Sequence, residues 1–358
     1  MRQSPTKLLC SDLYPRSYAA RIDRPWTIVL ALGQGPRELF DLPLLYGILY
    51  RMPRSPGCRI LLFLDKFLTM LKPWLLAIRP KTLAASVSPI LLGSALAYHD
   101  GLLQPLNLWL ALICALCLQI AVNLANDWFD GRSGVDTALR KGPTRVTQAG
   151  LMSPFQLLLG LGLVSALAIA SGLWLVALTS WGLLAFGLAA LLAVFAYSGG
   201  PWPLASHALG EVTVLMFFGW LAVGGSYYVH TLQINPVVLG FGTVAGLISA
   251  AIMLVNNIRD IATDGPANKR TLAVLLGDYR ARKLYVGLLI TAVIGHLVIS
   301  FPLGLVSLIP VLMMAPFLRR LVGAIRVRQG ADLNLQLAQT AQLLLLYCLA
   351  MSAVLVVF

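Results

Sequence analysis

The sequence has very few charged residues. Only 11% of its 358 residues are Asp, Glu, Lys or Arg, while 58% are hydrophobic. Soluble globular domains contain about 25% charged and about 45–50% apolar residues. An ordinary soluble domain is therefore excluded. Several apolar runs reach the length of about 20 residues that a membrane-spanning helix needs. We predict an all-α, polytopic membrane protein.

Cysteine and histidine are also scarce, with five and four copies. The odd number of cysteines gives no sign of a disulfide framework. Cys114 and Cys117 have the spacing of a redox or metal motif, but they lie within an apolar run with no second pair of ligands. We interpret them as small apolar helix residues.

The first 69 residues differ from the rest of the chain. They contain ten Lys and Arg residues and five acidic ones, and their two apolar stretches are too short to span a membrane. We interpret residues 1–69 as a weakly ordered basic extension, and a start site assigned too far upstream would explain it. Residues 70–358 then form the membrane domain.

Nine apolar segments of this domain predict a bundle of nine transmembrane helices. They are residues 82–98, 106–129, 154–174, 179–197, 209–230, 235–258, 284–300, 303–318 and 338–357. All seventeen Lys and Arg residues of the domain lie before the first span or after the second, sixth or eighth.

Positive charge at one membrane face marks the cytosolic side. We therefore expect a cytosolic N-terminus and an external C-terminus. The same distribution explains the net charge of +13, so no nucleic-acid partner is expected.

An aspartate cluster ends the second predicted span. Asn123, Asp127 and Asp130 are at positions i, i+4 and i+7, which lie on one face of a helix. Asn126 directly precedes Asp127.

A similar cluster ends the sixth predicted span. Asn256, Asp260 and Asp264 are at positions i, i+4 and i+8, again on one helical face, and Asn257 follows Asn256. Both spans run toward the cytosol, so both clusters lie at helix C-termini, where the helix dipole opposes negative charge.

Four aspartates placed together at such helix ends would repel one another. A bound divalent cation removes this conflict, and carboxylate and amide oxygens favour Mg²⁺ over Zn²⁺. The alternative interpretation is that these are solvated charges at helix ends. Two clusters, each on one helical face, favour a functional site.

Basic residues follow each cluster. Arg140, Lys141 and Arg145 come after the first, and Lys269 comes after the second. Such groups beside a carboxylate-bound Mg²⁺ are suited to a polyphosphate. A diphosphate with a hydrocarbon tail would match both this polar end and the apolar helices. An allylic diphosphate would ionise to a stabilised carbocation that an aromatic ring intercepts.

These motifs resemble the UbiA superfamily of intramembrane aromatic prenyltransferases. The similarity lies in Asn-Asp-x-x-Asp at 126–130, Asp-x-x-x-Asp at 260–264 and the nine predicted helices. Segments 74–83, 142–145, 197–201 and 269–277 resemble the 1,4-dihydroxy-2-naphthoate polyprenyltransferases in particular. The resemblance covers residues 72–358.

The resemblance implies an Mg²⁺-dependent transfer of a polyprenyl chain from polyprenyl diphosphate to 1,4-dihydroxy-2-naphthoate. The naphthoate loses its carboxylate, diphosphate is released, and demethylmenaquinone forms. The four aspartates would hold metal and diphosphate, together with Asn123, Asn126, Asn256 and Asn257. Arg79 and Lys81, just before the first span, are suggested by position and charge to bind the carboxylate of the acceptor.

The chain departs from the superfamily pattern after the fourth span. Many members have Tyr-x-x-x-Lys there, whereas Tyr197 is followed at this spacing by Pro201. The diphosphate would then use Lys141, Arg145 or Lys269. Two alternatives remain: another acceptor such as 4-hydroxybenzoate, and a membrane transporter. A transporter places its polar site near the midplane, whereas these clusters lie at one face.

Overall fold

The computed structural model describes residues 69–133, 142, 145–199 and 202–358. Arg140, Lys141 and nearly all of the predicted extension lie outside these residues. The backbone at Lys81 and Asp130 is helical, but their side chains are also outside the described part.

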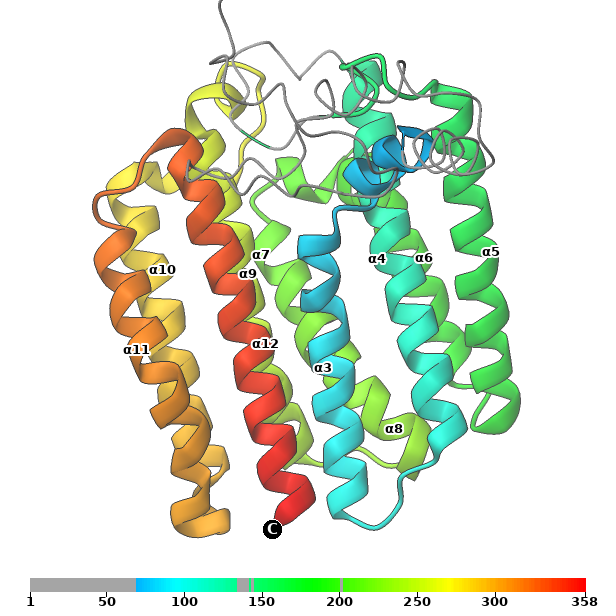
Figure 1. The fold of residues 1–358 in the computed structure, drawn as a ribbon, viewed down its shortest axis with the longest axis vertical. Helices are drawn as coiled ribbons and strands as arrows, with labels where there is room; N and C mark the ends of the chain where they lie inside the picture. The colour runs from blue at the N-terminus through cyan, green and yellow to red at the C-terminus, as the bar shows by residue number, and fades with distance from the viewer. Residues whose placement is uncertain (1–68, 134–141, 143–144, 200–201) are drawn as a thin grey trace, which may run out of the picture. The chain divides into compact units, whose positions relative to one another are not determined.

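The described part of the chain is helical and contains no β-strand. Its long helices run side by side, with the C-terminus at the opposite end from the two aspartate clusters (Figure 1). The main helices are α3 (Pro80–His99), α4 (Pro105–Ser133), α5 (Pro154–Leu178), α6 (Leu183–Ser198), α7 (Gly210–Val214), the π-helix η3 (Leu215–Gly224), α8 (Gly225–Thr231), α9 (Pro236–Asp264), α10 (Leu272–Ile299), α11 (Leu308–Ala324) and α12 (Leu333–Val357). The predicted fold class is confirmed.

Each of the nine predicted spans falls on a helical segment of the described residues. Seven helices there are long and apolar enough to cross a membrane, and the bent pair Thr69–Ile78 and Thr82–His99 would make eight. The apolar part of α6, Leu183–Tyr197, is shorter. The number nine is therefore reached only when the bent pair and this short helix are both counted.

The seventh predicted span begins too late in the sequence-based assignment. Prediction placed its start at residue 284, whereas α10 begins at Leu272, where the Thr271 hydroxyl accepts a hydrogen bond from the Val274 N–H. The helix is interrupted at Gly277 (φ 72°, ψ 161°) and continues from there to Ile299. The basic residues Arg280, Arg282 and Lys283 lie within the helix, and they led prediction to a loop. Charged residues are compatible with a helix end that lies outside the apolar belt.

Polar residues cap two other spans where they begin. Ser153 forms a reciprocal capping box with Gln156 at the start of α5, and the Asn235 side chain accepts from the Val238 N–H at the start of α9. Each cap is followed directly by proline, which is favoured in the first helical turn. The sequence therefore fixes where these helices enter the bundle.

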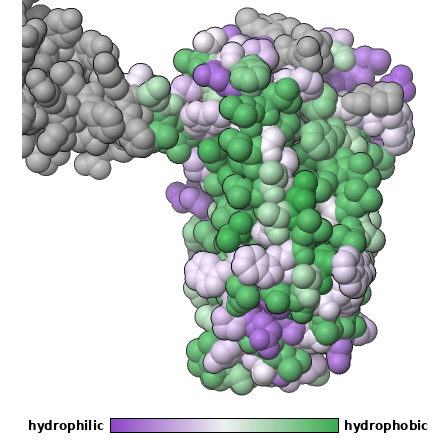
Figure 2. Space-filling view, turned by 90° about the vertical axis from the view of Figure 1, so that its right-hand side faces the viewer, coloured by the Kyte–Doolittle hydropathy of each residue, from purple (hydrophilic) through white to green (hydrophobic). Residues whose placement is uncertain are grey.

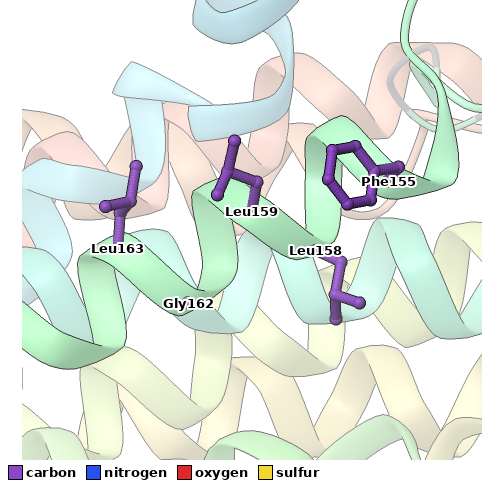
Figure 3. A pocket seen from close by; sticks show the side chains of 5 residues that line it. All are labelled: Phe155, Leu158, Leu159, Gly162 and Leu163. Carbon is purple, nitrogen blue, oxygen red and sulfur yellow. The ribbon is translucent and has the colours of Figure 1, made fainter.

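The outer surface is apolar through the middle of the bundle. Figure 2 shows a broad hydrophobic belt, polar side chains at the end that carries the clusters, and a smaller polar group toward the other end. The outer face of α5 belongs to this belt. A shallow hollow of about 330 Å³ on it is lined only by residues of this one helix, including Phe155 and Leu159 (Figure 3). It has no polar side chain, and we interpret it as lipid-facing surface.

Helices η3 and α9 touch through their backbones. A Cβ atom on Gly219 of η3 would lie 2.5 Å from the Gly242 carbonyl oxygen and 2.8 Å from Cα of Gly246, both on α9. Small residues permit such close approach of membrane helices. This contact fixes the span that begins at Gly210 against α9.

We expect Gly219→Ala to lower the thermal stability of the protein in detergent micelles. The added methyl has no room, and overpacking of this kind costs about 1–3 kcal/mol. Gly287→Ala on α10 is the matched control, because nothing lies within 4 Å of the Cβ position there. Equal unfolding midpoints for the two variants would contradict this account.

Candidate active site

A cavity of about 780 Å³ connects the two aspartate clusters. It is enclosed by α3, α4, α5, α6, η3 and α9, and it has a polar end and an apolar end. The predicted site residues that line it are Arg79, Asn123, Asn126, Arg145, Tyr197, Asn256, Asn257, Asp260, Asp264 and Lys269. Among the predicted residues whose side chains are described, only Asp127 is absent from the cavity wall.

Asp127 lies behind the wall as the centre of a buried ion cluster. Its side chain is fully buried, and its Oδ1 accepts hydrogen bonds from Arg79 and from Arg145 Nη1, the latter at 2.5 Å. The Val146 N–H also donates to Oδ2, at 3.4 Å. One carboxylate therefore holds two guanidinium groups at the edge of the cavity.

The backbone at Arg79 is bent to reach this cluster. Arg79 has φ 55° and ψ 69°, a left-handed conformation that costs a non-glycine residue on the order of 1–3 kcal/mol. The bend of 57° between Thr69–Ile78 and the helix that follows is at this residue. The ion pair with Asp127 offsets the cost of the strained backbone, and it anchors the first span to α4.

Asn123, one helical turn before Asp127 on α4, also holds the bend at Arg79 through hydrogen bonds. Its Nδ2 donates to the Ile78 carbonyl oxygen at 2.8 Å and to the Thr82 hydroxyl at 3.0 Å. The face of α4 predicted from spacing thus holds the start of α3, and Asn123 still borders the cavity.

The second cluster is organised by Arg259, which sequence reasoning did not include among the site residues. Its guanidinium donates to both carboxylate oxygens of Asp260, at 2.8 and 2.6 Å. It also donates to Asn256 Oδ1 at 2.8 Å and to Asn334 Oδ1 at 2.7 Å. An arginine directly before the aspartate, at the end of an apolar helix, was the available signal.

The remaining predicted residues complete the polar end. Lys269 Nζ lies 3.6 Å from Asp264 Oδ1, and the Tyr197 hydroxyl donates to the Met253 sulfur at 3.1 Å. Asn257 Nδ2 donates to Glu211 Oε1 at 2.8 Å. Glu211 is 5% exposed and contacts a cavity residue through this bond.

The donor chemistry of this end is suited to a hard cation that carries an anionic ligand. Oxygen atoms come from carboxylates and amides, and three basic side chains line the same cavity. Among the residues whose side chains are described, no three His, Cys, Asp or Glu residues form a metal-binding group. A cation here would therefore depend on amide oxygens and on the ligand as well as on carboxylates.

Comparison with known families decides the assignment. The model of the UbiA prenyltransferase family matches residues 86–356. The chain belongs to this family. It is 36% identical to a 1,4-dihydroxy-2-naphthoate octaprenyltransferase of Mycobacterium tuberculosis, across 79% of this chain and 96% of that protein. It is 38% identical to the enzyme of the same name from Escherichia coli, across 62% and 74%.

Solved UbiA structures share the fold. A UbiA homolog from Archaeoglobus fulgidus bound to GPP and Mg²⁺ matches with a TM-score of 0.58 at 17% identity, across 80% of this chain and 100% of that one. The apo structure of a homolog from Aeropyrum pernix matches with a TM-score of 0.59 at 16% identity, across 77% and 97%. At such identities the similarity establishes the UbiA fold alone.

We expect Asp127→Asn to destabilise this UbiA protein strongly. The change leaves two guanidinium groups beside a neutral side chain, and breaking a buried ion pair costs about 3–5 kcal/mol. Asp264→Asn is the matched control, since its basic partner Lys269 has a more exposed side chain at a longer distance. Thermal unfolding in micelles measures both. An Asp127→Asn protein as stable as the wild type would contradict a stabilising role for the ion pairs of Asp127 with Arg79 and Arg145.

Proposed function

We propose that this chain transfers a polyprenyl group from polyprenyl diphosphate to 1,4-dihydroxy-2-naphthoate. The bond between the allylic carbon and the diphosphate oxygen breaks, and a carbon–carbon bond forms on the naphthoate ring. The ring's bond to its carboxylate also breaks, so carbon dioxide and diphosphate are released. The immediate product is demethylmenaquinol, the reduced form of demethylmenaquinone, because the transfer itself oxidises nothing. The observation that supports this most directly is the cavity, whose charged end and apolar end match the two parts of such a donor. The names of the relatives support the acceptor.

The diphosphate lies at the charged end in this proposal. Arg145 and Lys269 contact it from opposite clusters, and Arg140 and Lys141 belong to the same proposed set. Guanidinium groups bind phosphate oxygens through paired hydrogen bonds. Because Asp127 already orients Arg145, little freedom is lost when the phosphate binds.

Arg79 is proposed to bind the acceptor carboxylate, with Lys81 as its neighbour. Arg79 lines the cavity and is held by Asp127 at the start of α3. An acceptor bound there has its ring beside the polar end, next to the bond that breaks.

Asp260, Asp264, Asn256 and Asn257 are proposed to hold Mg²⁺ from α9, with Asn126 from α4. Asp127 and Asp130 remain proposed ligands. Asp127 Oδ1 is bonded to two arginines, and Arg259 donates to both oxygens of Asp260 and to Asn256 Oδ1. Use of these oxygens by the cation would require the arginines to turn toward the phosphate. Mg²⁺ neutralises charge that develops on the departing diphosphate. The A. fulgidus homolog was solved with GPP and Mg²⁺, which supports a divalent cation in the proposal.

The prenyl tail lies at the apolar end. The wall there includes Leu118, Phe217 and Leu221, and it extends to Phe186 and Leu188 on α6. These last two side chains are 53% and 60% exposed. A chain longer than the cavity would therefore continue into the lipid bilayer. The apolar wall also keeps water from an allylic cation.

The clusters lie at the cytosolic face in this proposal, in a bacterial inner membrane. The N-terminus of the domain is then cytosolic and the C-terminus external. The basic extension 1–69 is proposed to be a separate, weakly ordered segment.

We expect the purified chain to form demethylmenaquinol from dihydroxynaphthoate and a polyprenyl diphosphate, detected by mass spectrometry as the quinol or as the demethylmenaquinone that air oxidation gives. EDTA should stop the reaction. Asp260→Ala should lower turnover by about a hundredfold or more, the scale of losing one preorganised electrostatic contact. Asp278→Asn, an exposed carboxylate on α10 outside the cavity, is the control.

Activity that persists without divalent metal would contradict the proposed mechanism. Faster prenylation of 4-hydroxybenzoate than of dihydroxynaphthoate would contradict the acceptor alone.

The tail position can be tested at Cys114, which lines the apolar part of the cavity. In a variant with Cys10 and Cys58 replaced by serine, we expect a small maleimide to react at Cys114, because Cys117 and Cys348 are buried. Polyprenyl diphosphate should slow the labelling, whereas inorganic diphosphate should not. Equal protection by both compounds would place the tail elsewhere. Loss of the label in Cys114→Ala identifies the site.

A further inference from the structure

Glu211 is a buried acid to which the proposed reaction assigns no role. It stands at the start of α7 with 5% of its surface exposed. Its Oε1 accepts from Asn257 Nδ2 at 2.8 Å, and its Oε2 has no hydrogen-bond partner among the described residues. Buried polar atoms are nearly always paired. The unpaired oxygen therefore costs stability, which makes a functional role for Glu211 worth testing.

The bond to Glu211 fixes which end of the Asn257 amide faces the cavity. A carboxylate has only acceptor atoms, so the amide must meet it with its nitrogen. Asn257 lines the cavity, and its Oδ1 makes no hydrogen bond within the described part of the chain. The oxygen is therefore the end left for a ligand.

This oxygen is on the same helical face as two carboxylates. Asn257, Asp260 and Asp264 follow one another at i, i+3 and i+7 along α9, and all three line the cavity. Divalent cations of the Mg²⁺ type take oxygen ligands, amide oxygens included. Groups behind a ligand that fix its orientation contribute substantially to metal affinity.

We propose that Glu211 is a positioning residue that holds Asn257 with its side-chain oxygen toward a divalent cation bound with diphosphate. This inference rests on the proposed function, because it assumes that a cation–diphosphate pair binds at the polar end. Glu211 does not line the cavity itself, and it acts only through Asn257. The span that carries Glu211 also packs closely against α9 at Gly219.

The test measures binding of Mn²⁺ to the purified full-length chain in micelles with inorganic diphosphate, from the electron paramagnetic resonance signal of free Mn²⁺. Glu211→Met removes the acceptor at similar volume, and Asn257→Leu removes the ligand oxygen. We expect each variant to bind Mn²⁺ about tenfold more weakly than the wild type. The double variant should be no weaker than either single one, because both changes remove the same contact.

Thermal unfolding separates positioning from a structural role. Glu211→Met removes a buried unpaired oxygen but also removes the partner of Asn257 Nδ2. These effects oppose each other, so we expect its unfolding midpoint to stay close to that of the wild type. Asp278→Asn removes an exposed carboxylate on α10 and should change neither measurement. If Glu211→Met does not fold, Glu211→Leu is measured in its place, with the same expectation for binding.

Wild-type Mn²⁺ affinity in the Glu211 variant, or losses that add in the double variant, would overturn the inference and leave the proposed function intact. Failure of the wild type itself to bind Mn²⁺ with diphosphate would overturn the metal site of the proposed function, and this inference with it.

Discussion

The buried carboxylate of Asp127 is the contact on which the polar end of the cavity depends. It joins the C-terminal end of α4 to Arg79 at the start of α3 and to Arg145 in the following connection. Without its charge, two guanidinium groups would be buried beside apolar helices, which is energetically unfavourable. One side chain therefore fixes the entry of the first span and the position of two cationic groups on the cavity wall.

In both clusters an arginine binds the aspartate, but the arginines come from different parts of the chain. In each, an aspartate four residues after an asparagine is bound by arginine: Asp127 by residues distant in sequence, and Asp260 by its neighbour Arg259. Arginine suits this role because its planar group binds a carboxylate and still has donors left. Arg259 uses those donors for Asn256 and Asn334. The repeated Asn-x-x-x-Asp pattern thus corresponds to a repeated physical arrangement.

Helical periodicity was sufficient to predict which side chains share a face, because the spacing of Asn123 and Asp127 or of Asn256 and Asp260 determines it directly. Hydropathy likewise placed the spans. Neither could predict the partner of Asp127, since Arg79 is 48 residues away and reaches it through a left-handed backbone. The contact of Glu211 with Asn257 depends on the approach of η3 to α9, which a single sequence does not encode locally. The predicted start of the seventh span was wrong because the basic residues at the beginning of α10 resemble those of a loop.

Among the described residues, each basic side chain that lines the cavity is paired with an aspartate. An isolated arginine at a membrane face would sample many rotamers, and ordering it on a diphosphate would cost about 0.5–1.5 kcal/mol. Arg145 has already lost this freedom to Asp127, at 2.5 Å. In the proposed role of Arg145 as a diphosphate ligand, the carboxylate weakens the arginine's attraction for phosphate but removes the entropy cost from the binding step. A site of this kind exchanges some affinity for a fixed geometry, and a fixed geometry is what directing one allylic carbon onto one ring position requires.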